Sequence, residues 1–211
     1  MTTSKPSIAE TIFSSLRDDI NNCHYESGQI ITESEISKKF GVSKTPAREA
    51  LGLLCQEGLL DKIPHKGYWV KSLSYTDIQH LFQFRIILET AAVKLAVQYA
   101  SDDEIKQLKP LAETTLSKDE EDLYNKYNKL NIEFHVGIAN LGKNPYISTN
   151  LESVLNKLRR ALITDLKATD VNTLLAAHSM ILEAIKERNL DKAIACTAQQ
   201  IEVIENRLFV R

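Results

Sequence analysis

The chain has few of the residues that stabilise tight turns, and few cysteines. Its 211 residues include seven glycines, five prolines and three cysteines. So few glycines and prolines argue against an all-β protein with many short turns and favour helices. The cysteines, Cys23, Cys55 and Cys196, have no metal-binding spacing, and their odd number suits a reducing compartment.

Excess charge and long apolar runs are also missing. The formal net charge of -2 excludes a basic nucleic-acid coat protein and an acidic tail protein, but it does not exclude local patches. The longest uncharged stretch, residues 171–182, has 12 residues, whereas about 20 are needed to span a bilayer. The first residues, MTTSKPSIAE, contain no apolar signal core. With 43% apolar and 26% charged residues, we expect a folded cytoplasmic protein that does not enter a membrane.

Residues 1–71 contain signals for three short helices and a hairpin. Apolar residues recur every fourth position from Ile8 to Ile20, and Thr32 with Glu35 has the spacing of a capping box. Ser43 is placed to cap a third helix that Gly58 ends. Two β-prone runs flank residues 64–67, which predicts a β-hairpin.

From Ser74 onward the sequence predicts only helices. We expect six, with short connections, in an antiparallel bundle. They are predicted at 74–99, from Ser101, at 119–141, from Asn144-Pro145, at 171–188 and at 191–209. The predicted domains are residues 1–71 and 72–211.

A cluster of cations marks the second and third helices. Four cations and no acid occur between Lys38 and Arg48, and the tight turn at residues 40–43 is typical of a helix-turn-helix. Lys44 and Arg48 could reach phosphates or guanines, while Ser43 and Thr45 could donate to phosphates. The alternative interpretation is an ordinary solvated cationic face.

The run GQIITESEISKKFGVSKTPAREALGLLCQEGLLDKIPHKGYWV, residues 28–70, resembles the winged helix of the GntR family of bacterial transcription regulators. This resemblance implies DNA contacts from seven residues of the recognition helix and the wing: Ser43, Lys44, Thr45, Arg48, His65, Lys66 and Gly67. The family usually has arginine where this chain has Lys44. Lysine keeps the charge but lacks the bidentate fork, so base recognition there is expected to differ.

The second domain resembles the FCD effector-binding domain of the FadR-type branch. The resemblance is carried by Arg85 with Leu88-Glu89, by NIEFHVGIANLGKNPYI at 131–147 and by AAHSMILEAIKERNLDKAIACTAQQI at 176–201. Six helices, in place of seven, resemble the VanR-like subset. The expected fold is therefore mostly α, a winged helix-turn-helix followed by a bundle of six or seven helices.

Many members of this branch hold a divalent metal with an aspartate and three histidines. The matching positions are Asn131, His135, His178 and Gln200, so two usual ligands are replaced by neutral amides. The resemblance implies either one zinc, nickel or manganese ion held by His135, His178 and Asn131, or a metal-free pocket in which these three residues and Gln200 hydrogen-bond the effector directly. Arg85 is either an effector ligand or the i, i+4 partner of Glu89.

Together these features predict a ligand-responsive repressor. We expect a homodimer on a near-palindromic DNA operator, because one winged helix reads one half-site. The resemblance implies a small carboxylate effector, such as a sugar acid, a dicarboxylate or an aromatic acid. An enzyme is not expected, because no general base, GxSxG motif or phosphate-binding glycine loop accompanies the histidines. An architectural winged-helix protein is the other alternative, and it would not respond to small molecules.

Overall fold

The computed structural model describes residues 6–162 and 170–209. The chain divides into two compact units, Met1–Ser74 and Tyr75–Arg211. In the described residues, no helix is both long and apolar enough to cross a membrane.

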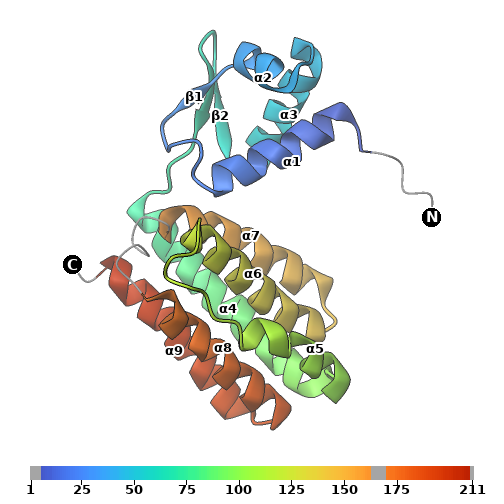
Figure 1. The fold of residues 1–211 in the computed structure, drawn as a ribbon, viewed down its shortest axis with the longest axis vertical. Coiled ribbons are helices and arrows are strands. Elements are labelled where there is room, and N and C mark those ends of the chain that lie inside the picture. Colours follow the sequence, from blue (N-terminus) through green and yellow to red (C-terminus); the bar gives the residue numbers. More distant parts are fainter. Residues whose placement is uncertain (1–5, 163–169, 210–211) are drawn as a thin grey trace. The chain divides into compact units, whose positions relative to one another are not determined.

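The first unit is a winged helix. Its elements are α1 (Ile8–Asn21), β1 (Ile30–Ile31), α2 (Glu33–Phe40), α3 (Lys44–Gln56), β2 (Leu60–Ile63) and β3 (Gly67–Val70) (Figure 1). The capping box is confirmed, because the Thr32 hydroxyl accepts from the amide of Glu35 at 3.1 Å. Gly41, in the left-handed region at φ 65°, then ends α2. The two helices, the turn and the hairpin therefore lie where the sequence predicts them.

The sheet contains a strand that the sequence analysis missed. β3 pairs antiparallel with β2 on one side and with β1 on the other, and Ile30 lies opposite Trp69. The core of the unit is formed by apolar residues of α1, α2, α3 and the sheet, including Leu16, Ile36 and Leu51. The three strands thus fix the hairpin against the helices.

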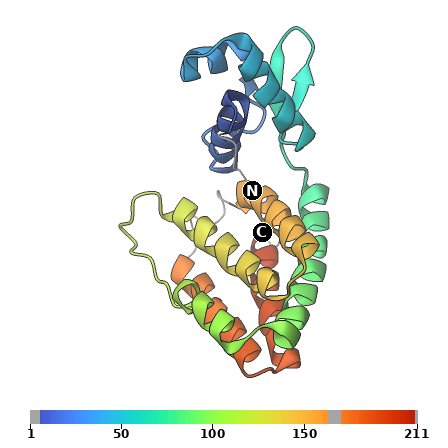
Figure 2. The same cartoon turned by 90° about the vertical axis from the view of Figure 1, so that its right-hand side faces the viewer.

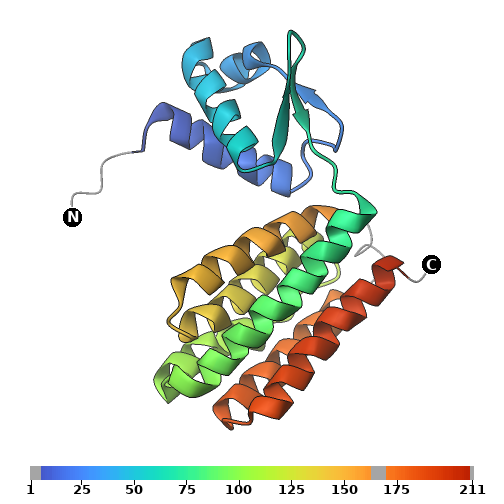
Figure 3. The ribbon, with the colours of Figure 1, turned by 180° about the vertical axis from the view of Figure 1, so that it is seen from behind.

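The second unit contains the six predicted helices in its described residues. They are α4 (Tyr75–Tyr99), α5 (Asp102–Ala112), α6 (Leu123–Leu141), α7 (Pro145–Leu162), α8 (Val171–Lys186) and α9 (Leu190–Phe209). Figure 3 shows the long α4 between α7 and α9. Helix α4 packs against both of these helices and against α6. Ser101 with Glu104 forms the predicted capping box of α5, and Asn144 accepts from the amide of Tyr146 at the start of α7.

One predicted helix start is wrong. α6 begins at Leu123, not near Asp119, and the preceding segment is a long excursion from the bundle (Figure 2). Two contacts explain this: Asn172 accepts from the amide of Leu116 and donates to its carbonyl, both at 2.8 Å. Asp122, in the left-handed region at φ 59°, then directs the chain into the helix. The acidic residues at 119–121 therefore precede the helix and do not lie in its first turn.

Candidate functional site

The N-terminal end of α3 presents three of the predicted DNA-binding residues. Ser43, Lys44 and Thr45 are all exposed. Ser43 is the residue before the helix, as predicted, but its hydroxyl makes no capping hydrogen bond. The first amides of any helix lack partners within that helix, and they attract anions. The backbone amides and the side chains at this end of the helix can therefore donate hydrogen bonds to the same phosphate.

Arg48 is exposed but not unpaired. Its side chain is 61% exposed, and it forms two hydrogen bonds with Glu33, the first residue of α2. Nε donates to Oε1 and Nη2 donates to Oε2, both at 2.8 Å. The Tyr68 hydroxyl donates to the same Oε1 at 3.3 Å. The sequence analysis missed Glu33, because nothing local relates it to a residue 15 positions later.

One cation of the predicted cluster has a different role. The Lys39 ammonium donates to Asp19 at 2.7 Å and to the Tyr25 hydroxyl at 3.2 Å. These partners come from α1 and the loop after it. Lys39 therefore links α2 to α1 and to the loop that follows α1.

The hairpin tip presents His65 and Lys66, which are exposed. His65 adopts the left-handed conformation at φ 62°. Gly67 has φ 131°, and a Cβ atom there would lie 2.7 Å from the carbonyl oxygen of Ile31. A glycine at this position is therefore explained by the close approach of β1, independently of any contact with DNA.

The second unit buries an ion pair in the bundle. Arg85 and Glu89 of α4 are 1% and 2% exposed, and Arg85 Nε donates to Glu89 Oε1 at 2.6 Å. His135 of α6 places Nδ1 2.7 Å from Glu89 Oε2. Burial alone would raise the pKa of Glu89, but His135 and Arg85 lower it to about 2. Glu89 is therefore an ionised carboxylate held between two buried nitrogen groups.

Three further predicted residues lie in the same interior. His178 Nε2 is 3.2 Å from Asn131 Oδ1, and the His178 ring stacks on Phe134 with ring centres 4.0 Å apart. Burial lowers the pKa of His178 well below its usual value, and His135 lowers it further, which keeps His178 neutral. The Gln200 amide donates to the Leu174 carbonyl at 3.4 Å.

These side chains leave buried polar atoms without partners. In the described part of the bundle they include Arg85 Nη2, Asn128 Nδ2, His135 Nε2, His178 Nδ1 and Gln200 Oε1. Buried polar groups normally find partners, so a concentration of unpartnered atoms marks a place where a ligand or water binds. The sequence analysis missed Asn128, although its position one helical turn before Asn131 could have indicated it.

The donor set does not fit a tightly held divalent metal. Within the described residues, no group of three or more His, Cys, Asp or Glu side chains is placed to hold one. The Asn131 oxygen faces His178, and Glu89 is already bound by Arg85 and His135. Two imidazoles with neutral amides are a weak ligand set for zinc, nickel or manganese.

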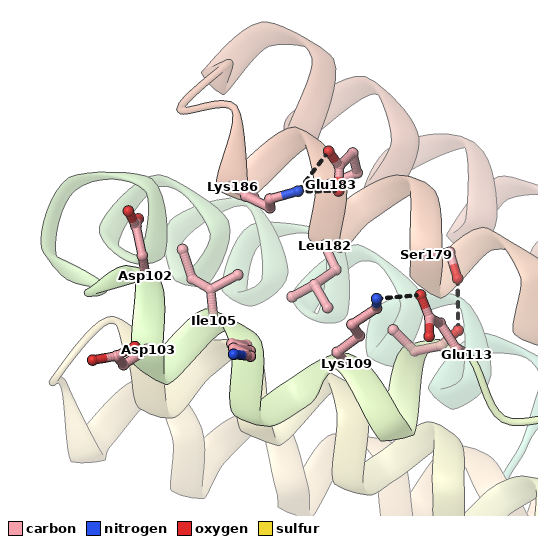
Figure 4. A pocket seen from close by; sticks show the side chains of 11 residues that line it. Asp102, Asp103, Ile105, Lys109, Glu113, Ser179, Leu182, Glu183 and Lys186 are labelled. Atoms are coloured by element: carbon pink, nitrogen blue, oxygen red, sulfur yellow. Dashed lines mark hydrogen bonds and ion pairs between the residues drawn. The ribbon is translucent and has the colours of Figure 1, made fainter.

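A separate surface groove of about 620 Å³ lies between α5 and α8 (Figure 4). Ile105, Ala112 and Leu182 contribute its apolar part, and ion pairs such as Lys109–Glu113 lie along it. None of the predicted effector-binding residues lines it. The groove and the buried polar cluster are therefore distinct features of the unit.

Comparisons with known proteins match both units. Residues 8–70 match the model for bacterial regulatory proteins of the gntR family, and residues 80–203 match the FCD domain. The Nta operon transcriptional regulator of Aminobacter aminovorans is 30% identical, over 85% of this chain and 84% of its own length. The gluconate operon transcriptional repressor of Bacillus subtilis is 25% identical, over 97% and 86%. The structure of E. coli McbR/YncC is similar, with a TM-score of 0.79, 19% identity, and coverage of 97% of this chain and 98% of that one.

Proposed function

Because the chain belongs to the GntR family of bacterial regulators and carries an FCD domain, we propose that it is a repressor whose operator affinity changes when a small organic acid binds. The family makes it a transcriptional regulator and not an enzyme. The repressor assignment is supported by the relative named as a repressor. A regulator of bacterial DNA acts in the cytoplasm, which we propose as its location.

Recognition of DNA is assigned to α3 and the hairpin. The exposed Ser43, Lys44 and Thr45 meet the phosphates and base edges at the start of α3, and Arg48 reads a base one turn later. His65, Lys66 and the backbone at Gly67 contact DNA from the wing. This set stays a proposal that a DNA complex would test.

The operator is proposed to be near-palindromic and bound by a homodimer, because one winged helix covers only a half-site. An exposed apolar pair on one face of α4 supports self-association: Phe84 and Ile87, one helical turn apart, are 43% and 64% exposed. A contact between two copies across a two-fold axis needs a self-complementary surface, and an uncharged apolar one satisfies that condition.

The effector is proposed to bind among the unpartnered atoms of the bundle, and this is the observation that carries the proposal. Arg85 Nη2 and Asn128 Nδ2 are donors, whereas the neutral His178 ring donates to Asn131 through Nε2 and therefore offers Nδ1 as an acceptor. Gln200 Oε1 is an acceptor. A carboxylate satisfies the two donors, and hydroxyl groups on the same molecule satisfy Gln200 Oε1 and His178 Nδ1. Of the three effector classes, this arrangement favours a hydroxylated acid such as a sugar acid.

The coupling is proposed to be a two-state change in the placement of the two DNA-binding units of the dimer. An effector that distinguishes the states by only ~1–3 kcal/mol changes the operator affinity by about 5- to 150-fold.

We propose that the site works without a resident metal, since neutral amides stand at two usual ligand positions. Elemental analysis of the purified untagged chain, before and after incubation with zinc, nickel and manganese, tests this. A stoichiometric ion would assign Asn131, His135 and His178 as its ligands and contradict the metal-free site.

The decisive experiment compares matched ligands. A duplex selected by the chain from a randomised library is titrated in the presence of gluconate, of its uncharged alcohol sorbitol, of a dicarboxylate and of an aromatic acid. The proposal expects an anion to change the DNA affinity, and expects sorbitol to have no effect. If no small molecule changes the affinity, an architectural protein is the better interpretation.

The variant Asn128→Leu links this response to the cluster. Leucine has a similar volume and removes an unpartnered donor, so the fold should be retained while the response to the anion is lost. The thermal midpoint of the variant provides the control for folding. A variant that responds like the wild type would place the effector elsewhere.

A further inference from the structure

Arg48 is held along only one edge of its guanidinium group. Glu33 engages Nε and one hydrogen of Nη2, each at 2.8 Å. An arginine side chain carries five N–H donors, so the two on Nη1 and the second on Nη2 are not used by Glu33. Nη1 and Nη2 form the outer edge of the group, which has the two-donor spacing that pairs with O6 and N7 of guanine. The ion pair therefore leaves the base-reading edge available.

Glu33 is itself fixed from three directions. It is the first residue of α2, whose start is set by the capping box of Thr32 and Glu35. The Tyr68 hydroxyl donates to Oε1, and Tyr68 is a buried residue of β3. The hydrogen bonds from Arg48 lower the pKa of Glu33, which keeps it ionised at neutral pH. Arg48 is thereby connected to both α2 and the hairpin.

A carboxylate beside a DNA-contacting arginine is unfavourable for simple electrostatic binding. It cancels the charge of Arg48 and repels nearby phosphates, which weakens contacts that any sequence can offer. A guanine edge, in contrast, rewards a correctly oriented guanidinium group through two directed hydrogen bonds. Specificity is the difference between these two affinities, and an acid at this position increases it.

We infer that Glu33 is a positioning residue that orients Arg48 toward a guanine in the operator and thereby sets sequence discrimination. This inference rests on the proposed DNA-binding function. It assigns Glu33 a role through Arg48, with no contact of its own to the DNA.

The test measures discrimination and not affinity alone. The duplex selected by the wild-type chain is compared with one in which each guanine is replaced in turn, and with an unrelated duplex, at one salt concentration. Glu33→Gln should strengthen binding to the unrelated duplex. It should also reduce the preference for one guanine by about tenfold, the worth of a bidentate base contact.

A matched control is available two residues away. Glu35→Gln removes the same charge from the same helical turn, and glutamine retains the capping function. It should strengthen binding to all duplexes equally and leave the guanine preference unchanged. Arg48→Lys should lose the same guanine preference. In the double variant, Glu33→Gln should cause no further loss of that preference.

Each outcome is distinguishable. A Glu33→Gln variant that behaves like Glu35→Gln, with the guanine preference retained, overturns the positioning role. A wild-type chain that selects no sequence overturns the DNA-reading function on which the inference rests. Circular dichroism and thermal midpoints of the variants separate both results from unfolding.

Discussion

The buried carboxylate of Glu89 provides the sharpest stability prediction. It accepts from Arg85 at 2.6 Å and lies 2.7 Å from His135 Nδ1, and all three side chains are 1–2% exposed. Glu89→Gln keeps the size of the side chain but removes its charge. The guanidinium group of Arg85 would then remain buried without its counter-charge, and an uncompensated buried charge strongly destabilises the folded state.

The expected loss follows from the pKa of Glu89. That pKa falls from 4.5 to about 2 in the folded chain. At ~1.4 kcal/mol per unit, the ionised group contributes about 3 kcal/mol to the free energy of unfolding at neutral pH. Removing one partner of a buried ion pair independently suggests a loss of ~3–5 kcal/mol.

Urea unfolding of the wild type and the variant at pH 7 and pH 3 measures this contribution. Because the folded pKa lies below the unfolded one, the contribution is present above pH 4.5 and is lost as the pH falls toward 2. At pH 3 the difference between the two proteins should shrink to about 1 kcal/mol.

The matched control is Glu183→Gln, which breaks an ion pair with Lys186 that is 53% and 62% exposed on the two sides. Such surface pairs contribute only ~0–1 kcal/mol, so this variant should unfold like the wild type. A Glu89→Gln variant as stable as that control, or a deficit that does not change with pH, would refute the argument that the buried charges support one another.

Three further predictions concern other parts of the chain. Gly67→Ala should destabilise the first unit by ~1–3 kcal/mol in urea unfolding, because its Cβ would meet the β1 backbone and its φ is 131°; unchanged stability would contradict this. Phe84→Asp with Ile87→Asp should shift the chain from dimer to monomer in sedimentation with its helical circular dichroism retained; a persisting dimer would place the interface elsewhere. Lys44→Ala should reduce the slope of DNA affinity against salt concentration by about one released ion. Lys39→Ala should mainly lower the thermal midpoint, since Lys39 binds Asp19. A Lys39→Ala variant that changes the salt dependence, with a Lys44→Ala variant that does not, would contradict these roles.

The architecture was predictable because its signals are local. The capping boxes of α2 and α5, the Asn144-Pro145 start of α7 and the glycine after α2 each act within a few residues, and the structure confirms them. The start of α6 was not predictable, because it depends on Asn172, which is 56 residues away in sequence from Leu116. Strand β1 has two residues and exists only through its pairing with β3.

The candidate sites were predictable as residue types but not as networks. The sequence indicated Arg48, Arg85 and His135, yet it did not show that Arg48 pairs with Glu33 or that His135 contacts Glu89. No local sequence pattern relates Glu33 to Arg48. The sequence suggested Glu89 only as an i, i+4 partner of Arg85, and not as a buried carboxylate that is shared with His135. These partners depend on how helices pack, which is a tertiary property.

The short strand β1 has a consequence for how the winged helix meets DNA. Ile31 lies opposite Tyr68 in the sheet, and the next residue is the N-cap of α2. Thr32 alone separates β1 from α2, and its capping box with Glu35 holds it in place, so this side of the unit has little room for a hinge. The unit therefore has little conformational entropy to lose when it binds DNA, so less of the free energy of each contact is offset by ordering the protein. The wing and the recognition helix should therefore engage and leave a half-site together.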